Sequence, residues 1–266
     1  MNCIDNLLKS SQTAMSLYSY SKLGKFKMVE RILSYNIPDI NFQDDNGCTS
    51  LYVASQAGHS EVVKVLIHAG ADIHLSCRDG STPLASAACE NRNEVCQILL
   101  NAGANINCTR NDGKTPLYIA SWQGHIPILK TLILNGANVN QPSSEGITPI
   151  AISAFYGQLE VVKLLVKAHA KILVEEDKKS KKDNNPLKMA RVGKLALQTG
   201  EQDKVVEYLM LELKWLRLRP LLLMRPHEDH ETNKKHRMTM IGCLVTAQES
   251  IDTELFYLKT IVASYL

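Results

Sequence analysis

The densest group of potential metal ligands lies near the C-terminal end of the chain, in residues 227–237 (HEDHETNKKHR). Its two leading histidines stand in a His-x-x-His pattern, followed by acidic residues and a further histidine; the set is His227, Glu228, Asp229, His230, Glu231 and His236. A tetrahedral zinc site needs a second pair of ligands, usually supplied by cysteines or histidines at a fixed spacing. This segment offers no such second half. We therefore favour a solvated polar linker, and an enzyme with a C-terminal metal site is the weaker alternative.

The cysteines are the next reactive group, and there are seven: Cys3, Cys48, Cys77, Cys89, Cys96, Cys108 and Cys243. An odd number without a CxxC pair does not indicate a disulfide framework. The sequence also shows no secretory leader and no apolar run of about 18 residues. These features predict a soluble intracellular protein, cytoplasmic or alternatively nuclear, with free thiols. Cys89 and Cys96 are expected to be small buried hydrophobic residues rather than nucleophiles.

Other catalytic patterns are missing from the sequence, which contains no Walker loop, no GxGxxG after a strand, no HExxH and no GxSxG. His59 and His125 follow glycines at equivalent positions, so we expect them to serve turns rather than catalysis. The 30 basic and 27 acidic residues leave a formal charge of only +3, too small to indicate nucleic acid or membrane by itself. We predict a protein that is not an enzyme and needs no metal or cofactor.

A 33-residue period organises the first two thirds of the chain. It relates four glycines, Gly47, Gly80, Gly113 and Gly146, and also Thr49, Thr82, Thr115 and Thr148. The apolar positions that keep the same step are Leu51, Leu84, Leu117 and Ile150, and Leu66, Leu99, Leu132 and Leu165. One step earlier, Val29 and Leu33 fall on the positions of Val62 and Leu66, which indicates a degenerate first repeat.

The repeated segments Gly-Ser-Thr-Pro-Leu (80–84) and Gly-Lys-Thr-Pro-Leu (113–117), with Gly-His-Ser-Glu-Val-Val-Lys-Val-Leu-Ile (58–67), resemble the ankyrin-repeat family. The resemblance covers about residues 10–173 without a gap and agrees at several positions in four consecutive periods. It implies an all-α solenoid of stacked helix–turn–helix repeats, in which neighbouring repeats bury each other's apolar faces.

The residue types fit this arrangement. A threonine before proline can cap a helix, and proline at the first helical position loses no hydrogen bond. Glycine tolerates the positive φ that ends such a helix, and Asn91, which replaces it once, is the next best tolerated residue. Val62, Leu66 and Ile67 share one face of the second helix. Pro127 falls in the first turn of a second helix, where it is allowed.

These patterns predict five repeats, a linker, a sixth repeat and an extension. The repeats cover about 10–41, 42–74, 75–107, 108–140 and 141–173, and the charged linker is 174–185. Residues 186–210 are read as a degenerate sixth repeat, because Val205 follows Val161 by one period plus eleven residues. The rest, 211–266, is predicted to be a helical extension that includes a helix over Leu211–Met224 ended by Pro220 and an amphipathic helix from Ile251 to Val262.

We expect a partner protein to bind the concave face, where turn tips and first helices present variable residues. By the resemblance, these are Asp45, Arg78, Asp79, Asp112, Lys114 and Glu145 on the tips, and Gln56, Cys89, Trp122, Phe155 and Tyr156 on the helices. The aromatic residues are the predicted anchors. Packing between repeats is the competing interpretation of Trp122 and Phe155. Tips of mixed sign argue against a nucleic acid, which would need one sign along the groove.

Two further interpretations concern the C-terminal extension. It could recruit a second protein such as a ubiquitin ligase component, although a Leu-Pro-rich box is missing. Its basic residues Lys214, Arg217, Arg219 and Arg225 lie among leucines and could touch an anionic membrane surface. Helix packing with the charged groups extended to water explains them as well and is preferred.

Overall fold

The computed structural model describes residues 3–35, 39–172, 186, 189–190 and 201–223 of the chain. The helices in these ranges are α1 (Cys3–Lys22), α2 (Phe26–Tyr35), α3 (Ser50–Ala57), α4 (Ser60–His68), α5 (Pro83–Cys89), α6 (Asn93–Asn101), α7 (Pro116–Gln123), α8 (Ile126–Leu134), α9 (Pro149–Phe155), α10 (Leu159–Lys167) and α12 (Glu201–Leu223). The chain up to residue 213 belongs to one compact part.

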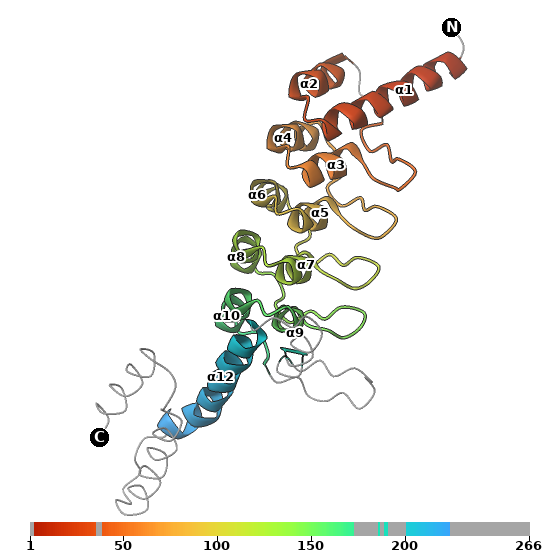
Figure 1. Cartoon of the computed structure of the whole chain (residues 1–266). Coiled ribbons are helices and arrows are strands. Elements are labelled where there is room, and N and C mark those ends of the chain that lie inside the picture. Colours follow the sequence, from red (N-terminus) through yellow and green to blue (C-terminus); the bar gives the residue numbers. More distant parts are fainter. Residues whose placement is uncertain (1–2, 36–38, 173–185, 187–188, 191–200, 224–266) are drawn as a thin grey trace, which may run out of the picture. The chain divides into compact units, whose positions relative to one another are not determined.

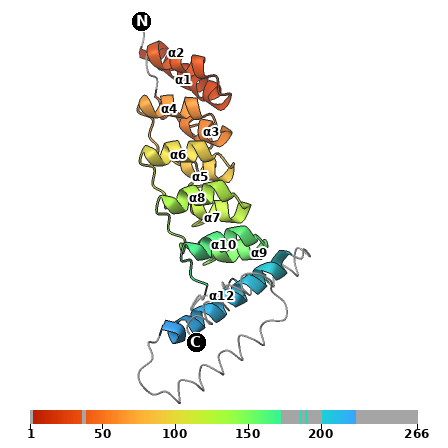
Figure 2. The same ribbon diagram turned by 90° about the vertical axis from the view of Figure 1, so that its left-hand side faces the viewer.

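The helices of this part stack in two rows (Figures 1 and 2). The first helices of the repeats, α1, α3, α5, α7 and α9, each contact the next in one row, and α2, α4, α6, α8 and α10 form the other. Hairpin-like loops project from the row of first helices (Figure 1). The predicted all-α repeat solenoid is confirmed.

The core lies between the two rows and uses the residues that keep the 33-residue period. Each of these eight side chains has at most 1% of its surface exposed: Leu51, Leu84, Leu117, Ile150, Leu66, Leu99, Leu132 and Leu165. Burying one such side chain contributes roughly 1.5–3 kcal/mol. A single helix pair cannot cover these faces, so each repeat depends on its neighbours for its stability.

The boundaries of the first helices follow the predicted chemistry. Thr49, Thr82, Thr115 and Thr148 each accept a hydrogen bond at the side-chain oxygen from the amide three residues later. Asn91 takes a positive φ of 56° where other repeats use glycine, and the stack continues through it. Pro127 lies in the first turn of α8. The predictions for these three features are confirmed.

Two helix boundaries differ from the prediction. Helix α1 begins at Cys3, well before the predicted start of the first repeat near residue 10. Helix α12 begins at Glu201 and continues through Pro220 to Leu223, so the prediction that Pro220 ends a separate helix is wrong. Because Pro220 falls in the last turn, it removes one backbone hydrogen bond without breaking a long stretch of helix.

Candidate functional site

The loop tips are built alike in four repeats. In the second repeat the amide of Gly47 donates to the carbonyl of Asp44 at 2.8 Å, and Asp44 in turn donates to the carbonyl of Cys48 at 3.0 Å. The same two bonds recur at residues 77–81, 110–114 and 143–147. Neighbouring tips are joined by backbone bonds, of which Arg78 N to Asn46 O at 2.8 Å is the first. The tips therefore form a continuous, regularly spaced row.

A ladder of side chains fixes the ends of the first helices. The residue before each of α4, α6, α8 and α10 reaches back to a carbonyl of the preceding repeat: His59 to Lys22 at 3.1 Å, Arg92 to Gln56 at 3.1 Å, His125 to Cys89 at 3.0 Å and Gln158 to Trp122 at 2.9 Å. Gln202, the second residue of α12, reaches the carbonyl of Phe155 in the same way at 3.2 Å. The structural role predicted for His59 and His125 is confirmed. Four of the five acceptors are residues that the sequence placed on the binding face, so the ladder holds the backbone at those positions.

The predicted aromatic residues lie close together. The ring centroids of Trp122 and Tyr156 are 6.3 Å apart, and those of Phe155 and Tyr156 are 5.1 Å apart in an edge-to-face arrangement. Trp122 is 36% exposed and Tyr156 is 38% exposed, whereas Phe155 is half-buried. Trp122 and Tyr156 thus present apolar ring surface to solvent from two adjacent repeats, and Phe155 supports Tyr156 from the side.

Charged side chains of the tips extend this aromatic group. The ammonium of Lys114 lies 5.2 Å from the centroid of the Trp122 ring and 3.0 Å from Asp112 Oδ2. Burial acts to raise the pKa of Asp112, but the hydrogen bond and charge of Lys114, together with the charge of Arg110, lower it below its ordinary value. Arg110 also pairs with Asp79 at 2.9 Å. Sequence reasoning named Lys114 and Trp122 separately and missed their contact, because it depends on how far the tip folds back over α7.

The other predicted residues are more dispersed. Gln56, Asp45, Arg78 and Glu145 are exposed, and Cys89 is half-buried at the end of α5. Cys96 is fully buried, and burial raises the pKa of its thiol to about 12. The expectation of a buried hydrophobic role therefore fits Cys96 and is wrong for Cys89, whose position at the helix end leaves it partly open to solvent.

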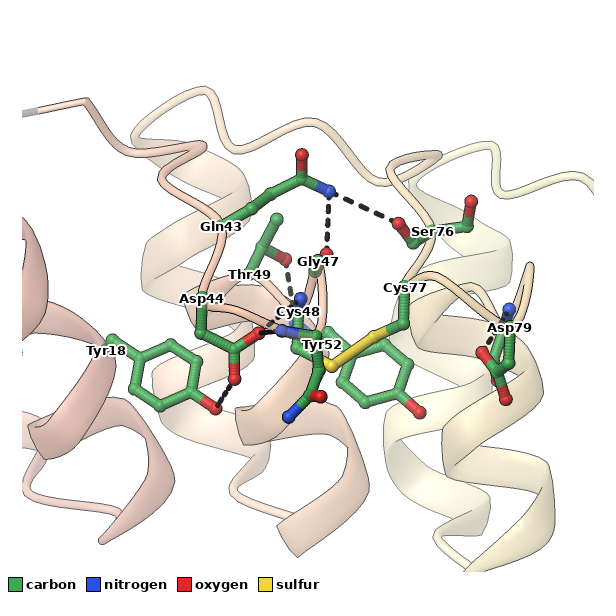
Figure 3. The surroundings of a disulfide bond; sticks show 12 residues. Tyr18, Gln43, Asp44, Gly47, Cys48, Thr49, Tyr52, Ser76, Cys77 and Asp79 are labelled. Carbon is green, nitrogen blue, oxygen red and sulfur yellow. Dashed lines mark hydrogen bonds between the residues drawn. A yellow bond between two sulfur atoms is a disulfide. The ribbon is translucent and has the colours of Figure 1, made fainter.

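The prediction of free thiols is wrong for Cys48 and Cys77. They form a disulfide between the tips of the second and third repeats, with the two Cα atoms 4.7 Å apart (Figure 3). Their separation of 29 residues is not the repeat period, so the periodic alignment placed them at different tip positions. Stacking brings the two positions together, since the end of one tip lies beside the start of the next.

A polar network beside the disulfide was also missed (Figure 3). The hydroxyl of Tyr18 on α1 donates to Asp44 Oδ2 at 2.8 Å, and the amide of Cys48 donates to Asp44 Oδ1 at 2.8 Å. Burial acts to raise the pKa of Asp44, but these bonds and the amide of Asn46 lower it below its ordinary value. Burial and the bond to Asp44 raise the pKa of Tyr18 to about 12.

A comparison with protein families agrees with this architecture. A model for ankyrin repeats, described as three copies, matches residues 2–77, 72–143 and 117–214, which together span most of the chain. The chain belongs to the ankyrin-repeat family. Ankyrin repeats generally serve as protein–protein interaction modules. No curated protein matches this ankyrin-repeat chain over its sequence.

Several predictions for this ankyrin-repeat protein fall on residues that the structure does not describe. The His-rich segment 227–237, Arg225 and the amphipathic helix from Ile251 to Val262 lie outside the described residues. Lys214, Arg217 and Arg219 belong to α12. Within the described residues, no three His, Cys, Asp or Glu side chains are grouped to hold a metal, and none of the helices is both long and apolar enough to cross a bilayer.

Proposed function

We propose that this protein is a non-catalytic interaction module that binds a partner protein on the predicted concave face, with Trp122 and Tyr156 as anchors. The observation that carries the proposal is the exposed pair of rings from adjacent repeats, whose centroids are 6.3 Å apart. Tryptophan and tyrosine are enriched among the residues that contribute most to binding energy. Isolated exposed apolar side chains are ordinary, but two rings side by side offer a shared apolar surface.

The anchors are held in place before binding. The Trp122 carbonyl accepts a hydrogen bond from Gln158, and the Phe155 carbonyl accepts one from Gln202. Lys114 covers part of the Trp122 ring, at 5.2 Å from its centroid. A binding surface that is already ordered loses little conformational entropy on association, so more of the contact energy appears as affinity.

The tips supply specificity in this proposal. Asp45, Arg78, Asp79 and Glu145 are exposed and include charges of both signs, while Asp112 and Lys114 are paired with each other. A partner with complementary charges would be oriented by these groups, and a uniformly charged polyanion would meet repulsion at the acidic positions. Gln56 and Cys89 occupy the helix ends that correspond to Trp122 and mark the continuation of the same face.

In this proposal, the repeat predicted for 186–210 supports the site from the other side. Gln202, which is fully buried, continues the ladder of side chains, and Val205 and Leu209 are fully buried in the shared core. Gly157 packs so closely on α12 that an added Cβ would lie 2.9 Å from that of Glu201. In this proposal the first part of α12 is the second helix of the repeat predicted for 186–210, and Phe155 and Tyr156 lie inside the stack rather than at its end.

The test begins with a partner captured by the full-length chain and a measured dissociation constant. Trp122→Ala and Tyr156→Ala are each expected to weaken binding by about 30-fold, the equivalent of roughly 2 kcal/mol. The matched control is Leu134→Ala on α8, because Leu134 is 86% exposed but belongs to the other row of helices. Unchanged affinity of both aromatic variants, with an intact fold, would refute the anchor proposal.

A further inference from the structure

Asparagine side chains connect most adjacent repeats in the segment that follows the second helix. Asn41 Oδ1 accepts from the amide of Asp72 at 2.9 Å, Asn107 Oδ1 from Asn138 at 2.8 Å, and Asn140 Oδ1 from Lys171 at 2.7 Å. Donor and acceptor are 31 residues apart in each case. These bonds link the first repeat to the second, the third to the fourth, and the fourth to the fifth.

The second and third repeats lack this connection. The position equivalent to these asparagines is His74, which is exposed and makes no such bond to the third repeat within the described residues. At this junction the disulfide Cys48–Cys77 joins the two tips instead, and Gln43 Nε2 donates to the carbonyls of Gly47 and Ser76 at 2.6 and 3.2 Å (Figure 3). The equivalent pairs at the later junctions are Ser81 with Arg110 and Lys114 with Ser143, which cannot form a disulfide.

We propose that Cys48 and Cys77 form a reversible thiol–disulfide switch that fastens the second repeat to the third, at the junction that lacks the asparagine bond. Reduction would loosen this junction selectively. Repeats in a solenoid are stabilised mainly by their nearest neighbours, so the first and second repeats would then open more readily than the fourth and fifth. This inference does not depend on the partner site proposed at Trp122 and Tyr156.

The chemistry is exchange with a small thiol–disulfide couple such as glutathione. In the oxidising direction, the thiolate of one cysteine attacks the small disulfide, and the mixed disulfide is then attacked by the other cysteine. The two protein thiols lose two protons and two electrons, and two molecules of the small thiol are released. In the reducing direction, a small thiolate attacks the sulfur of Cys48 first, because Cys48 is the more exposed of the two residues. Cys48 is half-buried, whereas Cys77 is buried with 8% of its surface exposed.

The experiment equilibrates the full-length protein in glutathione mixtures of increasing reducing strength and follows it by two readouts. A non-reducing tryptic digest is expected to show peptide 32–64 linked to peptide 65–78 in oxidised samples, and these peptides separately in reduced ones. Hydrogen exchange of α3 and α4 is expected to become about tenfold faster or more on reduction, while α7 and α8 change by less than about twofold.

Three variants make the test specific. Cys48→Ala is expected to show fast exchange in α3 and α4 with or without reductant, whereas Cys89→Ser with Cys108→Ser should respond to reduction like the wild type. His74→Asn, a change at an exposed position, is expected to restore the missing bond and slow exchange in the reduced protein. The proposal is overturned if reduced and oxidised protein exchange equally in α3 and α4, if the linked peptide never forms, or if His74→Asn leaves the reduced protein unchanged.

Discussion

The tips of the second and third repeats and those of the fourth and fifth have the same backbone but different side-chain chemistry. The former are joined by a disulfide and by the network of Tyr18, Asp44 and Gln43, which tie the tips to their surroundings. The latter carry the Lys114–Asp112 pair beside the exposed rings of Trp122 and Tyr156. One repeated scaffold therefore uses equivalent positions for internal attachment at one place and for an exposed surface at another.

The glycines of the tips give the largest expected difference between the two regions. Gly47 and Gly113 have φ values of +77° and +75°, but an added Cβ would lie 3.1 Å from Arg78 N at the first and would clash with the backbone of Ser144 at the second. Gly113→Ala should destabilise the protein by about 3 kcal/mol and Gly47→Ala by about 1 kcal/mol. Urea unfolding of both variants measures this. Equal losses would show that the two junctions are packed equally closely.

The Tyr18–Asp44 bond gives the next largest effect on stability, and it tests how firmly the tip of the second repeat is attached to α1. Tyr18→Phe removes the hydroxyl and should cost about 1 kcal/mol at neutral pH. The pKa of Asp44 is lower in the folded protein than in the unfolded chain. The contribution of Asp44 to stability is therefore fully present above its pKa in the unfolded chain, and it is lost as pH falls through its pKa in the folded protein. The variant should therefore lose less stability between about pH 5 and pH 2 than the wild type does.

The alkaline side provides an independent check of the same bond. The pKa of Tyr18 is raised to about 12 in the folded protein. The contribution of Tyr18 to stability is therefore fully present below its pKa in the unfolded chain, and it is lost as pH rises through its pKa in the folded protein. Tyr118, whose pKa burial also raises to about 12, titrates in the same range. Tyr18→Phe should reduce, without abolishing, the loss of stability above about pH 10. An unchanged alkaline profile would contradict a bond between Tyr18 and Asp44.

The Lys114–Asp112 pair gives the smallest effect and tests the exposed character of the later tips. Lys114→Met should lower the free energy of unfolding by less than about 1 kcal/mol, since both side chains of the pair are partly exposed to solvent. The pKa of Asp112 should rise toward its ordinary value, which can be followed by NMR titration. Lys130→Met on α8 is the control, because Lys130 is exposed and has no ion pair among the described residues. If Lys114→Met loses much more stability than Lys130→Met in 1 M salt, the pair contributes to the stability of the fold, contrary to this prediction.

Sequence reasoning predicted the periodic features well because each depends on a local pattern. The leucines at 66, 99, 132 and 165 recur at one position of a helix face, and all are fully buried. Threonine before proline starts each of three first helices, since capping requires only nearby atoms. The boundary at Pro220 was predicted wrongly, because a proline in the last turn of a helix is tolerated where a central one is not.

The contacts between repeats were harder to predict. The pairing of Cys48 with Cys77 and the bond from Tyr18 to Asp44 join residues at positions that the alignment of repeats treats as unrelated. The cation–π contact of Lys114 with Trp122 depends on the return path of a tip over its own helix. One signal was present: Cys77 stands at a tip position that the other repeats fill with the polar residues Asp44, Arg110 and Ser143.

The sequence by itself determined the repeat, the starts of the capped first helices and the apolar positions, because these follow from spacing, capping and burial within a short stretch of chain. Only the tertiary structure decided which residues of neighbouring repeats meet. Stacking fixes the offset between successive repeats, and that offset places Cys77 beside Cys48 and Tyr156 beside Trp122. The chemistry of this protein lies at these junctions, where distance in space is set by packing rather than by distance along the chain.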